Sequence, residues 1–320
     1  MDVLEKPKFW LKHSRVPLLK QMYSFLSERK RNHSKQRRMA KVARGKGRLI
    51  TLEDLTSWTK EWIKSFPESY DLIVGIPRSG LFVASLISIK LGRPLATPDV
   101  FVRGEHWKSK SMPEFNNIRK ILLVEDCLNT GKDMDRCHEM IKQYSDSYIV
   151  TRAAPIVHEK SKNKVDLYYK VVPHPRFFEW EFIHHKKVQI LGVDMDGVLC
   201  ENCPSHVDKD DALYMNWLSN ARPYLIPYYE IDFIITNRLE KYRAITEKWL
   251  ADHNVRYNKL IMWNVQDKSE RSGGWVANKV KALQVCKPNM FIESNVNQAQ
   301  GIWEATSIPT LCTDEMILFQ

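Results

Sequence analysis

Several features are missing from this 320-residue sequence. It contains no apolar run that reaches the roughly 18 residues needed to cross a bilayer. Its first residues, MDVLEKP, lack the layout of a signal peptide. The six cysteines show no framework spacing, and Cys200 and Cys203 form an isolated C-x-x-C without a partner pair at finger spacing, which argues against a zinc site. We therefore expect a cytoplasmic protein.

Excess charge is also absent from most of the chain. The formal net charge is +11, yet residues 1–48 hold 15 Lys and Arg against 3 Asp and Glu, which leaves 34 against 35 in the remainder. No groove-reading or aromatic-basic pattern follows, so the charge argues against nucleic acid as a partner. The arm of residues 1–48 mixes bulky apolar groups with cations. This pattern fits peripheral contact with the inner face of a membrane, or a helix packed on the next domain.

The length favours two domains, because single cores rarely grow beyond about 250 residues. An aromatic stretch that begins with proline and has no clear period, residues 173–187, is interpreted as the junction between them. The expected organisation is therefore a basic amphipathic arm (1–48), a first α/β domain (49–172), the junction, and a second α/β domain (188–320).

Residues 121–133 (ILLVEDCLNTGKD) predict a buried strand that ends in two acids and a phosphate-binding turn. Adjacent carboxylates at Glu125 and Asp126 can hold the two hydroxyls of a ribose. Backbone N–H groups around Thr130 and Gly131 can surround a phosphate at the start of the next helix. The pattern therefore indicates a sugar phosphate as the ligand.

Residues 71–92 repeat the order of strand, turn and helix about 45 residues upstream. The turn between them carries Arg78, Ser79 and Gly80, which offer a cation, a hydroxyl and a close backbone approach. Between the two motifs, residues 97–117 contain several cations. They are interpreted either as a loop that closes over the ligand or as an ordinary solvated loop.

These two motifs resemble those of the type I phosphoribosyltransferases, whose donor is phosphoribosyl pyrophosphate (PRPP). The resemblance implies that Glu125 and Asp126 bind the ribose hydroxyls. It also implies that Arg78, Ser79 and Gly80 bind the pyrophosphate. The 5-phosphate is then expected to bind at Thr130, Gly131 and Lys132. Asp133 departs from the family, which usually has a hydroxyl residue at that position.

Residues 188–199 (VQILGVDMDGVL) predict a second strand that ends in two carboxylates one residue apart. Three later segments accompany it: an apolar strand that ends at Thr236, a helix over 276–283 that carries Lys279, and an acidic strand end at Glu293. Together they resemble the four motifs of the haloacid dehalogenase (HAD) superfamily. The resemblance implies a Rossmann-like domain with phosphatase activity.

The HAD resemblance implies a role for each of these residues. Asp194 attacks phosphorus, Asp196 acts as acid and base, Thr236 holds the phosphoryl group and Lys279 offsets charge, with Lys281 as the less favoured lysine. Asn237 and Arg238 are expected to bind phosphate. Magnesium is expected on Asp194, on Asp196 through its backbone carbonyl, and on Glu293, although Ser294 and Asn295 stand where many members have a second acid. About 40 residues separate Asp194 from Thr236, so only a minimal cap is expected.

The two resemblances together imply a bifunctional enzyme that installs a 5-phosphoribosyl group and then removes its phosphate. This combination resembles the dual-domain ribofuranosyltransferases of bacterial surface-polysaccharide assembly, such as O-antigen or capsule. It implies PRPP as donor, a lipid-linked glycan as acceptor and Mg²⁺ as cofactor. Two alternatives stay open: a nucleobase phosphoribosyltransferase fused to a nucleotidase, with Phe101 or Trp107 stacking on the base, and a regulator that senses PRPP.

Overall fold

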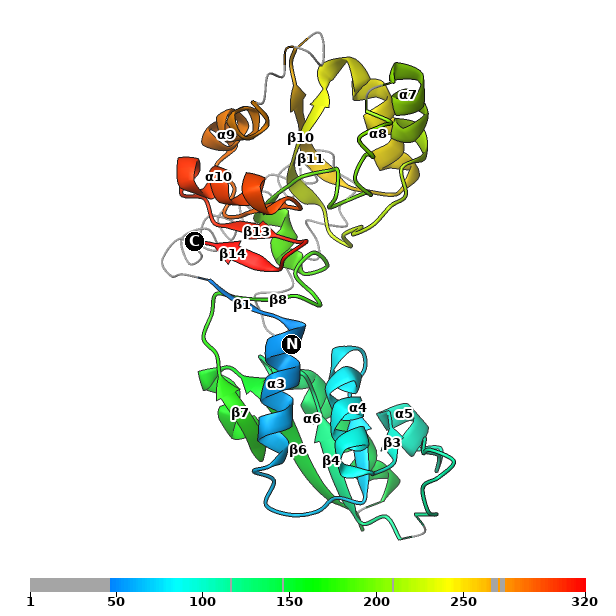
Figure 1. The fold of residues 1–320 in the computed structure, drawn as a ribbon. Coiled ribbons are helices and arrows are strands. Elements are labelled where there is room, and N and C mark those ends of the chain that lie inside the picture. Colours follow the sequence, from blue (N-terminus) through cyan, green and yellow to red (C-terminus); the bar gives the residue numbers. More distant parts are fainter. Residues whose placement is uncertain (1–46, 116, 146, 209, 266–269, 271–273) are drawn as a thin grey trace, which may run out of the picture. The chain divides into compact units, whose positions relative to one another are not determined.

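The computed structural model describes residues 47–115, 117–145, 147–208, 210–265, 270 and 274–320 (Figure 1). The chain divides into two compact units, here called the N-terminal unit (48–181) and the C-terminal unit (182–320, with Gly47). This division falls within the predicted junction of residues 173–187. The predicted basic arm covers residues 1–48, of which residues 1–46 lie outside the described residues. None of the helices in the described ranges is long and apolar enough to cross a membrane.

A parallel sheet with strand order β3-β2-β4-β6-β5 forms the centre of the N-terminal unit, and β7 pairs with β6. The strands are β2 (Leu72–Gly75), β3 (Leu95–Ala96), β4 (Lys120–Val124), β5 (Cys127–Leu128), β6 (Ile149–Val157) and β7 (Leu167–Val171). The helices are α3 (Leu52–Ile63), α4 (Ser79–Leu91), α5 (Pro98–Phe101), α6 (Lys132–Tyr144) and the 3-10 helix η1 (Glu159–Lys164). A separate parallel pair joins β1 (Arg48–Ile50) to β8 (Arg176–Phe178).

Strand alternation gives this sheet two apolar faces. Leu72, Val74 and Leu123 pack with residues of α5 and α6, whereas Ile73 and Leu122 pack with residues of α3 and α4. Successive strand residues point to opposite faces, so helices cover both sides and the central strands β2 and β4 are almost entirely buried. The predicted strands over 72–75 and 121–124 therefore form as central strands of one sheet.

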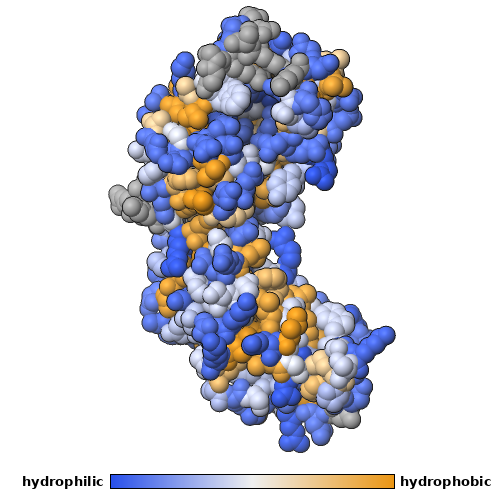
Figure 2. Space-filling model, viewed as in Figure 1, coloured by the Kyte–Doolittle hydropathy of each residue, from blue (hydrophilic) through white to orange (hydrophobic). Residues whose placement is uncertain are grey.

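Helix α4 is apolar on all sides and ends at Gly92, whose positive φ of 60° caps the helix in the left-handed region. Its inner side packs in the core through Val83, Ala84 and Ile87. Its outer side leaves Phe82 and Ile89 exposed, and apolar atoms gather on the surface over this helix (Figure 2).

The C-terminal unit contains a sheet with strand order β11-β10-β9-β12-β13-β14, parallel except for the last pair. The strands are β9 (Gly192–Val193), β10 (Ile231–Leu239), β11 (Tyr257–Trp263), β12 (Phe291–Glu293), β13 (Thr310–Cys312) and β14 (Ile317–Phe319). The helices are α7 (Asp211–Asn220), α8 (Arg243–Asp252), α9 (Trp275–Cys286) and α10 (Val296–Thr306), with 3-10 helices η2 (Lys186–Ile190) and η3 (Glu240–Tyr242).

The strand predicted from Val188 is much shorter than expected. Residues 186–190 form the 3-10 helix η2, and only Gly192 and Val193 pair with β10 and β12. Val188 and Leu191 are nonetheless buried. A short apolar run indicates burial but does not distinguish a strand from a helical turn, which explains the difference.

The segment between β9 and β10 holds one helix, α7, and the gap in the described residues at 209. Helix α7 packs against α8 (Figure 1) and buries Tyr214, Trp217 and Leu218. The helix in the described part of this segment therefore packs against its own unit.

Candidate active sites

The ends of β2 and β4 bring the two motifs of the N-terminal unit together. The strands pair in parallel with Gly75 opposite Val124, so the turns that follow them lie at one edge of the sheet. A Cβ atom on Gly80 would stand 2.8 Å from the carbonyl oxygen of Val124 and 3.0 Å from Cα of Glu125. Only glycine therefore lets the first turn of α4 approach the backbone of the acidic motif this closely.

Asp126 is held by two side chains that are distant from it in sequence. Its carboxylate is 8% exposed, accepts a hydrogen bond from Trp180 Nε1 at 2.9 Å and accepts another from the Ser79 hydroxyl. Burial raises the pKa of this carboxyl, and the two hydrogen bonds act in the opposite direction. The sequence predicted Ser79 and Asp126 as site residues, but no local signal pointed to Trp180.

The carboxyl group of Glu125 lies in a position that shifts its pKa strongly. Its Oε2 atom is buried without a hydrogen-bond partner. Burial, followed by the nearby charges of Asp126, Asp133 and Asp135, raises the pKa of its carboxyl to about 8. At neutral pH the side chain therefore holds a proton and can donate a hydrogen bond to a ligand hydroxyl as well as accept one.

We expect Glu125 to make the chain less stable as pH rises. The folded state holds the proton up to about pH 8, whereas an unfolded chain releases it near the ordinary pKa of 4.5, so stability is lost as pH climbs through this window. Relative to Glu125→Gln, the wild type should lose on the order of 2 to 4 kcal/mol between pH 5 and pH 9. Urea unfolding at each pH measures this difference. The exposed Glu139→Gln should behave as wild type, and equal pH slopes for wild type and Glu125→Gln would contradict the assignment.

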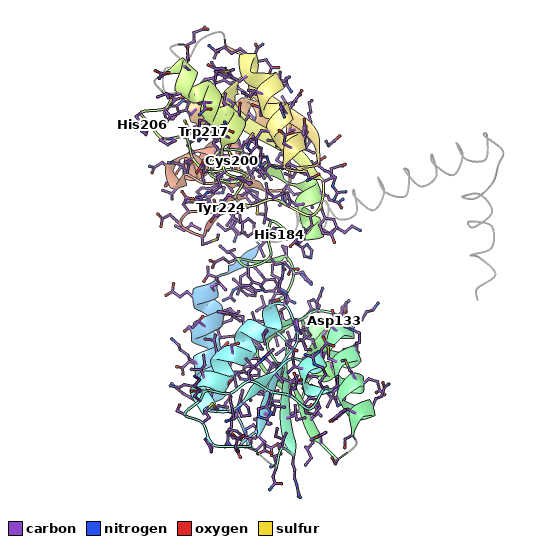
Figure 3. The ribbon with its side chains drawn as sticks, turned by 90° about the vertical axis from the view of Figure 1, so that its right-hand side faces the viewer. Asp133, His184, Cys200, His206, Trp217 and Tyr224 are labelled. Carbon is purple, nitrogen blue, oxygen red and sulfur yellow. The ribbon has the colours of Figure 1, made fainter. Side chains whose placement is uncertain are left out.

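The predicted phosphate turn forms the start of α6. Gly131 stands at the N-cap with a φ of 76°, and Thr130 and Lys132 beside it are exposed. Asp133 lies at the same end of the helix (Figure 3) and pairs with Arg136 at 3.0 Å. The helix N-terminus therefore presents free backbone N–H groups.

Lys164 adds a cation to this turn that the sequence did not predict. It comes from the end of η1, and its Nζ atom donates to the carbonyl oxygen of Thr130 at 2.7 Å. Its side-chain Cδ atom lies 2.7 Å from the position of a Cβ on Gly131. Because Lys164 is far from the turn in sequence, spacing alone gave no signal for it.

Of the two aromatic residues suggested for base stacking, Phe101 is placed elsewhere. It is 5% exposed and packs edge-on against Tyr144 and Tyr148 in the core. Trp107 is half exposed and its backbone pairs with Leu95. Phe101 is therefore a core residue, since its apolar ring is buried between α5 and α6.

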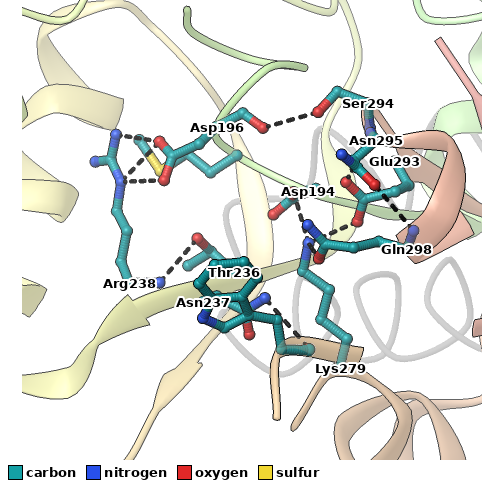
Figure 4. Close-up of polar contacts among 12 residues, drawn as sticks. Asp194, Asp196, Thr236, Asn237, Arg238, Lys279, Glu293, Ser294, Asn295 and Gln298 are labelled. Atoms are coloured by element: carbon teal, nitrogen blue, oxygen red, sulfur yellow. Dashed lines mark hydrogen bonds and ion pairs between the residues drawn. The ribbon is translucent and has the colours of Figure 1, made fainter. Parts of the chain in front are cut away.

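In the C-terminal unit, Lys279 connects the ends of β9 and β12 (Figure 4). Its Nζ atom donates to Asp194 Oδ2 at 2.7 Å, to Glu293 Oε2 at 2.6 Å and to Gln298 Oε1 at 3.2 Å. Both carboxylates and the lysine are almost fully buried. Burial raises the pKa of Asp194 and the Lys279 ammonium opposes it. Burial disfavours the charged Lys279, but Asp194 and Glu293 outweigh this and raise its pKa.

Arg238 is predicted to bind phosphate, but its guanidinium group contacts the carboxylate of Asp196. Its Nη2 atom lies 2.6 Å from Asp196 Oδ1, and its Nε atom lies 3.0 and 3.2 Å from the two carboxylate oxygens. The guanidinium is fully buried, 5.1 Å from the ring of Trp217 and 3.4 Å from Cys200 Sγ; Figure 3 labels Trp217 and Cys200. The planar guanidinium group of Arg238 therefore holds the carboxylate of Asp196 in one orientation.

Thr236 lies on the same strand and is 1% exposed. Its hydroxyl oxygen accepts a hydrogen bond from the backbone N–H of Arg238 at 3.2 Å, which leaves the hydroxyl hydrogen free to be donated. The neighbouring Asn237 is tied to α9, because it donates to the carbonyl oxygen of Trp275 at 3.3 Å and accepts from Asn278 at 2.9 Å. Asn237 therefore holds the start of α9 against β10.

The side chains of the three residues predicted to hold magnesium have other partners, although Asp196 is predicted to bind through its backbone carbonyl. Asp196 pairs with Arg238. Glu293 pairs with Lys279 through one oxygen and accepts backbone N–H groups of Ser294 and Asn295 with the other. Accordingly, within the described ranges no three His, Cys, Asp or Glu side chains form a group that could hold a metal ion. Lys279 contacts only the Oδ2 atom of Asp194 (Figure 4).

A metal ion nevertheless has suitable oxygens here. Asp194 supplies a carboxylate, Asp196 a backbone carbonyl, and Ser294 a hydroxyl at 3.3 Å from that carbonyl. Oxygen donors of these kinds suit a hard cation such as Mg²⁺. The donor set therefore fits magnesium, with a different ligand in place of Glu293.

Comparison with known proteins gives limited information. No protein-family model matches the chain, and no curated protein matches it. Among solved structures, it is similar to a xanthine-guanine-hypoxanthine phosphoribosyltransferase from Helicobacter pylori, with 16% identity, a TM-score of 0.34, and coverage of 42% of this chain and 92% of the other. A purine phosphoribosyltransferase from Pyrococcus horikoshii shows 18% identity, a TM-score of 0.33 and coverage of 42% and 94%.

An orotate phosphoribosyltransferase from Aeropyrum pernix shows 14% identity, a TM-score of 0.27, and coverage of 38% of this chain and 71% of its own. TM-scores this low identify neither a family nor an activity. The functional argument therefore depends on the residues of the two sites.

Proposed function

We propose that the chain is a two-domain enzyme that transfers a 5-phosphoribosyl group from PRPP to a glycan hydroxyl and then removes the 5-phosphate. The observation that supports this most strongly is the arrangement of Asp194, Asp196, Thr236 and Lys279 at one end of the C-terminal sheet. This set contains a nucleophile, an acid, a phosphoryl-binding hydroxyl and a balancing cation. Its presence in the same chain as the PRPP motifs suggests a phosphorylated ribosyl product as its substrate.

In the phosphatase step, Lys279 holds one oxygen of Asp194, which leaves the other oxygen to attack phosphorus. Asp196, fixed by Arg238, enters the cycle as the carboxylic acid, gives its proton to the ribose 5-oxygen as the bond from that oxygen to phosphorus breaks, and takes a proton back from the water that attacks the aspartyl phosphate. Thr236 donates its hydroxyl hydrogen to a phosphoryl oxygen. Bound magnesium would neutralise the phosphoryl oxygens as they approach the carboxylates.

In the transfer step, Glu125 and Asp126 hold the ribose hydroxyls, while the start of α6 and Lys164 hold the 5-phosphate. Arg78, Ser79 and Gly80 bind the pyrophosphate that leaves as the acceptor oxygen attacks C1 of the ribose. Salvage of nucleobases gains little from later loss of the 5-phosphate, because its purpose is to keep the nucleotide. A glycan acceptor makes use of both steps.

One observation favours a nucleobase acceptor as the second candidate. Phe178 and Trp180 stack with ring centroids 4.9 Å apart, and Trp180 also holds Asp126. An aromatic face beside the ribose position suits a flat base. The chain would then be a nucleobase phosphoribosyltransferase fused to a nucleotidase.

The two candidates are separated by incubating the full chain with PRPP, Mg²⁺ and either free nucleobases or a lipid-linked glycan. We expect ribosylation of the glycan and no nucleotide or nucleoside. Formation of either base product would overturn the glycan assignment, and PRPP binding without transfer to any acceptor would indicate a PRPP sensor.

A further inference from the structure

Gly197 makes room for two neutral oxygens beside the phosphatase nucleophile. It follows Asp196 directly and has a φ of 84°. A Cβ on this glycine would stand 2.2 Å from Ser294 Oγ and 2.6 Å from Asn202 Oδ1. The hydroxyl of Ser294 also lies 3.3 Å from the carbonyl oxygen of Asp196. The missing side chain thus lets the Ser294 hydroxyl and the Asn202 amide oxygen pack directly against the backbone at Gly197, with the hydroxyl next to the Asp196 carbonyl.

Glu293 cannot supply a ligand here without breaking contacts. Its Oε2 atom lies 2.6 Å from the buried Lys279 ammonium, and its Oε1 atom accepts backbone N–H groups at 3.0 and 3.2 Å. The residue is 1% exposed. A buried carboxylate with this set of partners is satisfied, and moving it would leave Lys279 with less compensation.

We propose that the divalent cation of the C-terminal unit is held by Asp194, the backbone carbonyl of Asp196 and the hydroxyl of Ser294, so that Asp194 is its single carboxylate ligand. Glu293 positions Lys279 instead of binding the cation. This inference rests on the proposed phosphatase function. A site with one carboxylate binds Mg²⁺ weakly, because ligand charge is a main determinant of affinity.

The test is a titration of the full chain with Mn²⁺, a probe for oxygen-rich magnesium sites, in which electron paramagnetic resonance reports the free ion. Ser294→Asp should tighten binding about tenfold by adding a second carboxylate. Asn297→Asp is the matched control, because it adds the same charge to an exposed position near the start of α10 and should leave the affinity within about twofold.

Two further variants keep the test decisive if Ser294→Asp does not fold, which circular dichroism would reveal. Ser294→Ala should weaken Mn²⁺ binding severalfold, and Asp194→Asn should remove it. Glu293→Gln should retain measurable binding. Loss of binding in Glu293→Gln, or unchanged affinity in both Ser294 variants, would overturn the proposal. Because Mn²⁺ binding is measured without substrate, a chain that binds the ion yet releases no phosphate would count against the proposed function alone.

Discussion

Asp194→Asn is expected to stop the second reaction and leave the first intact. The asparagine keeps an oxygen that can accept from Lys279, but it has no carboxylate to attack phosphorus. Phosphate release should fall at least about 10⁴-fold. The transferred product should then accumulate with its 5-phosphate. Mass spectrometry of the glycan product and a phosphate-release assay measure the two effects.

The control for this variant is Asp252→Asn, which removes the same charge from an exposed pair with Lys248 on α8. It should release phosphate at the wild-type rate. If Asp194→Asn still yields an unphosphorylated product, Asp194 is not the nucleophile. The assignment of phosphate removal to the C-terminal unit is then wrong.

Lys279→Met should destabilise the C-terminal unit strongly. The change leaves Asp194 and Glu293 buried without their common cation. Breaking a buried ion pair by removing one partner costs about 3 to 5 kcal/mol of unfolding free energy. Chemical denaturation measures the loss. Lys281→Met is the matched control on the same helix, because Lys281 is exposed and its loss should stay within about 0.5 kcal/mol.

The destabilisation by Lys279→Met should also depend on pH. Burial raises the pKa of Asp194 and the Lys279 ammonium opposes this, so removing the ammonium raises that pKa further in the folded state. Protonation of Asp194 then relieves the buried charge at low pH, and the loss of stability grows as pH rises. A loss of equal size at pH 5 and pH 8, or equal losses for Lys279→Met and Lys281→Met, would show that Lys279 does not balance these acids.

The sequence predicted the strand ends well because their signals are local. An apolar run followed by acids placed Asp126 after β4 and Asp194 after β9, and a parallel sheet then brings such ends to one edge. Lys279, the lysine favoured by the resemblance to the HAD motifs, is buried on α9, whereas the alternative Lys281 is exposed. These assignments needed only periodicity and motif order.

The remaining contacts depend on packing between distant segments. Arg238 follows Thr236 closely in the sequence, which suggested a shared phosphate, but its burial against Trp217 directs it to Asp196. Trp180 and Lys164 reach their sites from segments about 54 and 34 residues away. Periodicity carries no information about which distant polar groups meet in a core.

The central claim is that one chain transfers the ribosyl group and then discards its phosphate. The most direct measurement uses PRPP labelled separately in the ribose and in the 5-phosphate, with Mg²⁺, a lipid-linked glycan acceptor and the full chain. We predict that the ribose label enters the glycan, and that the 5-phosphate label first enters the glycan and later appears as inorganic phosphate. Release of the 5-phosphate label without acceptor, or before the ribose label reaches the glycan, would contradict the account.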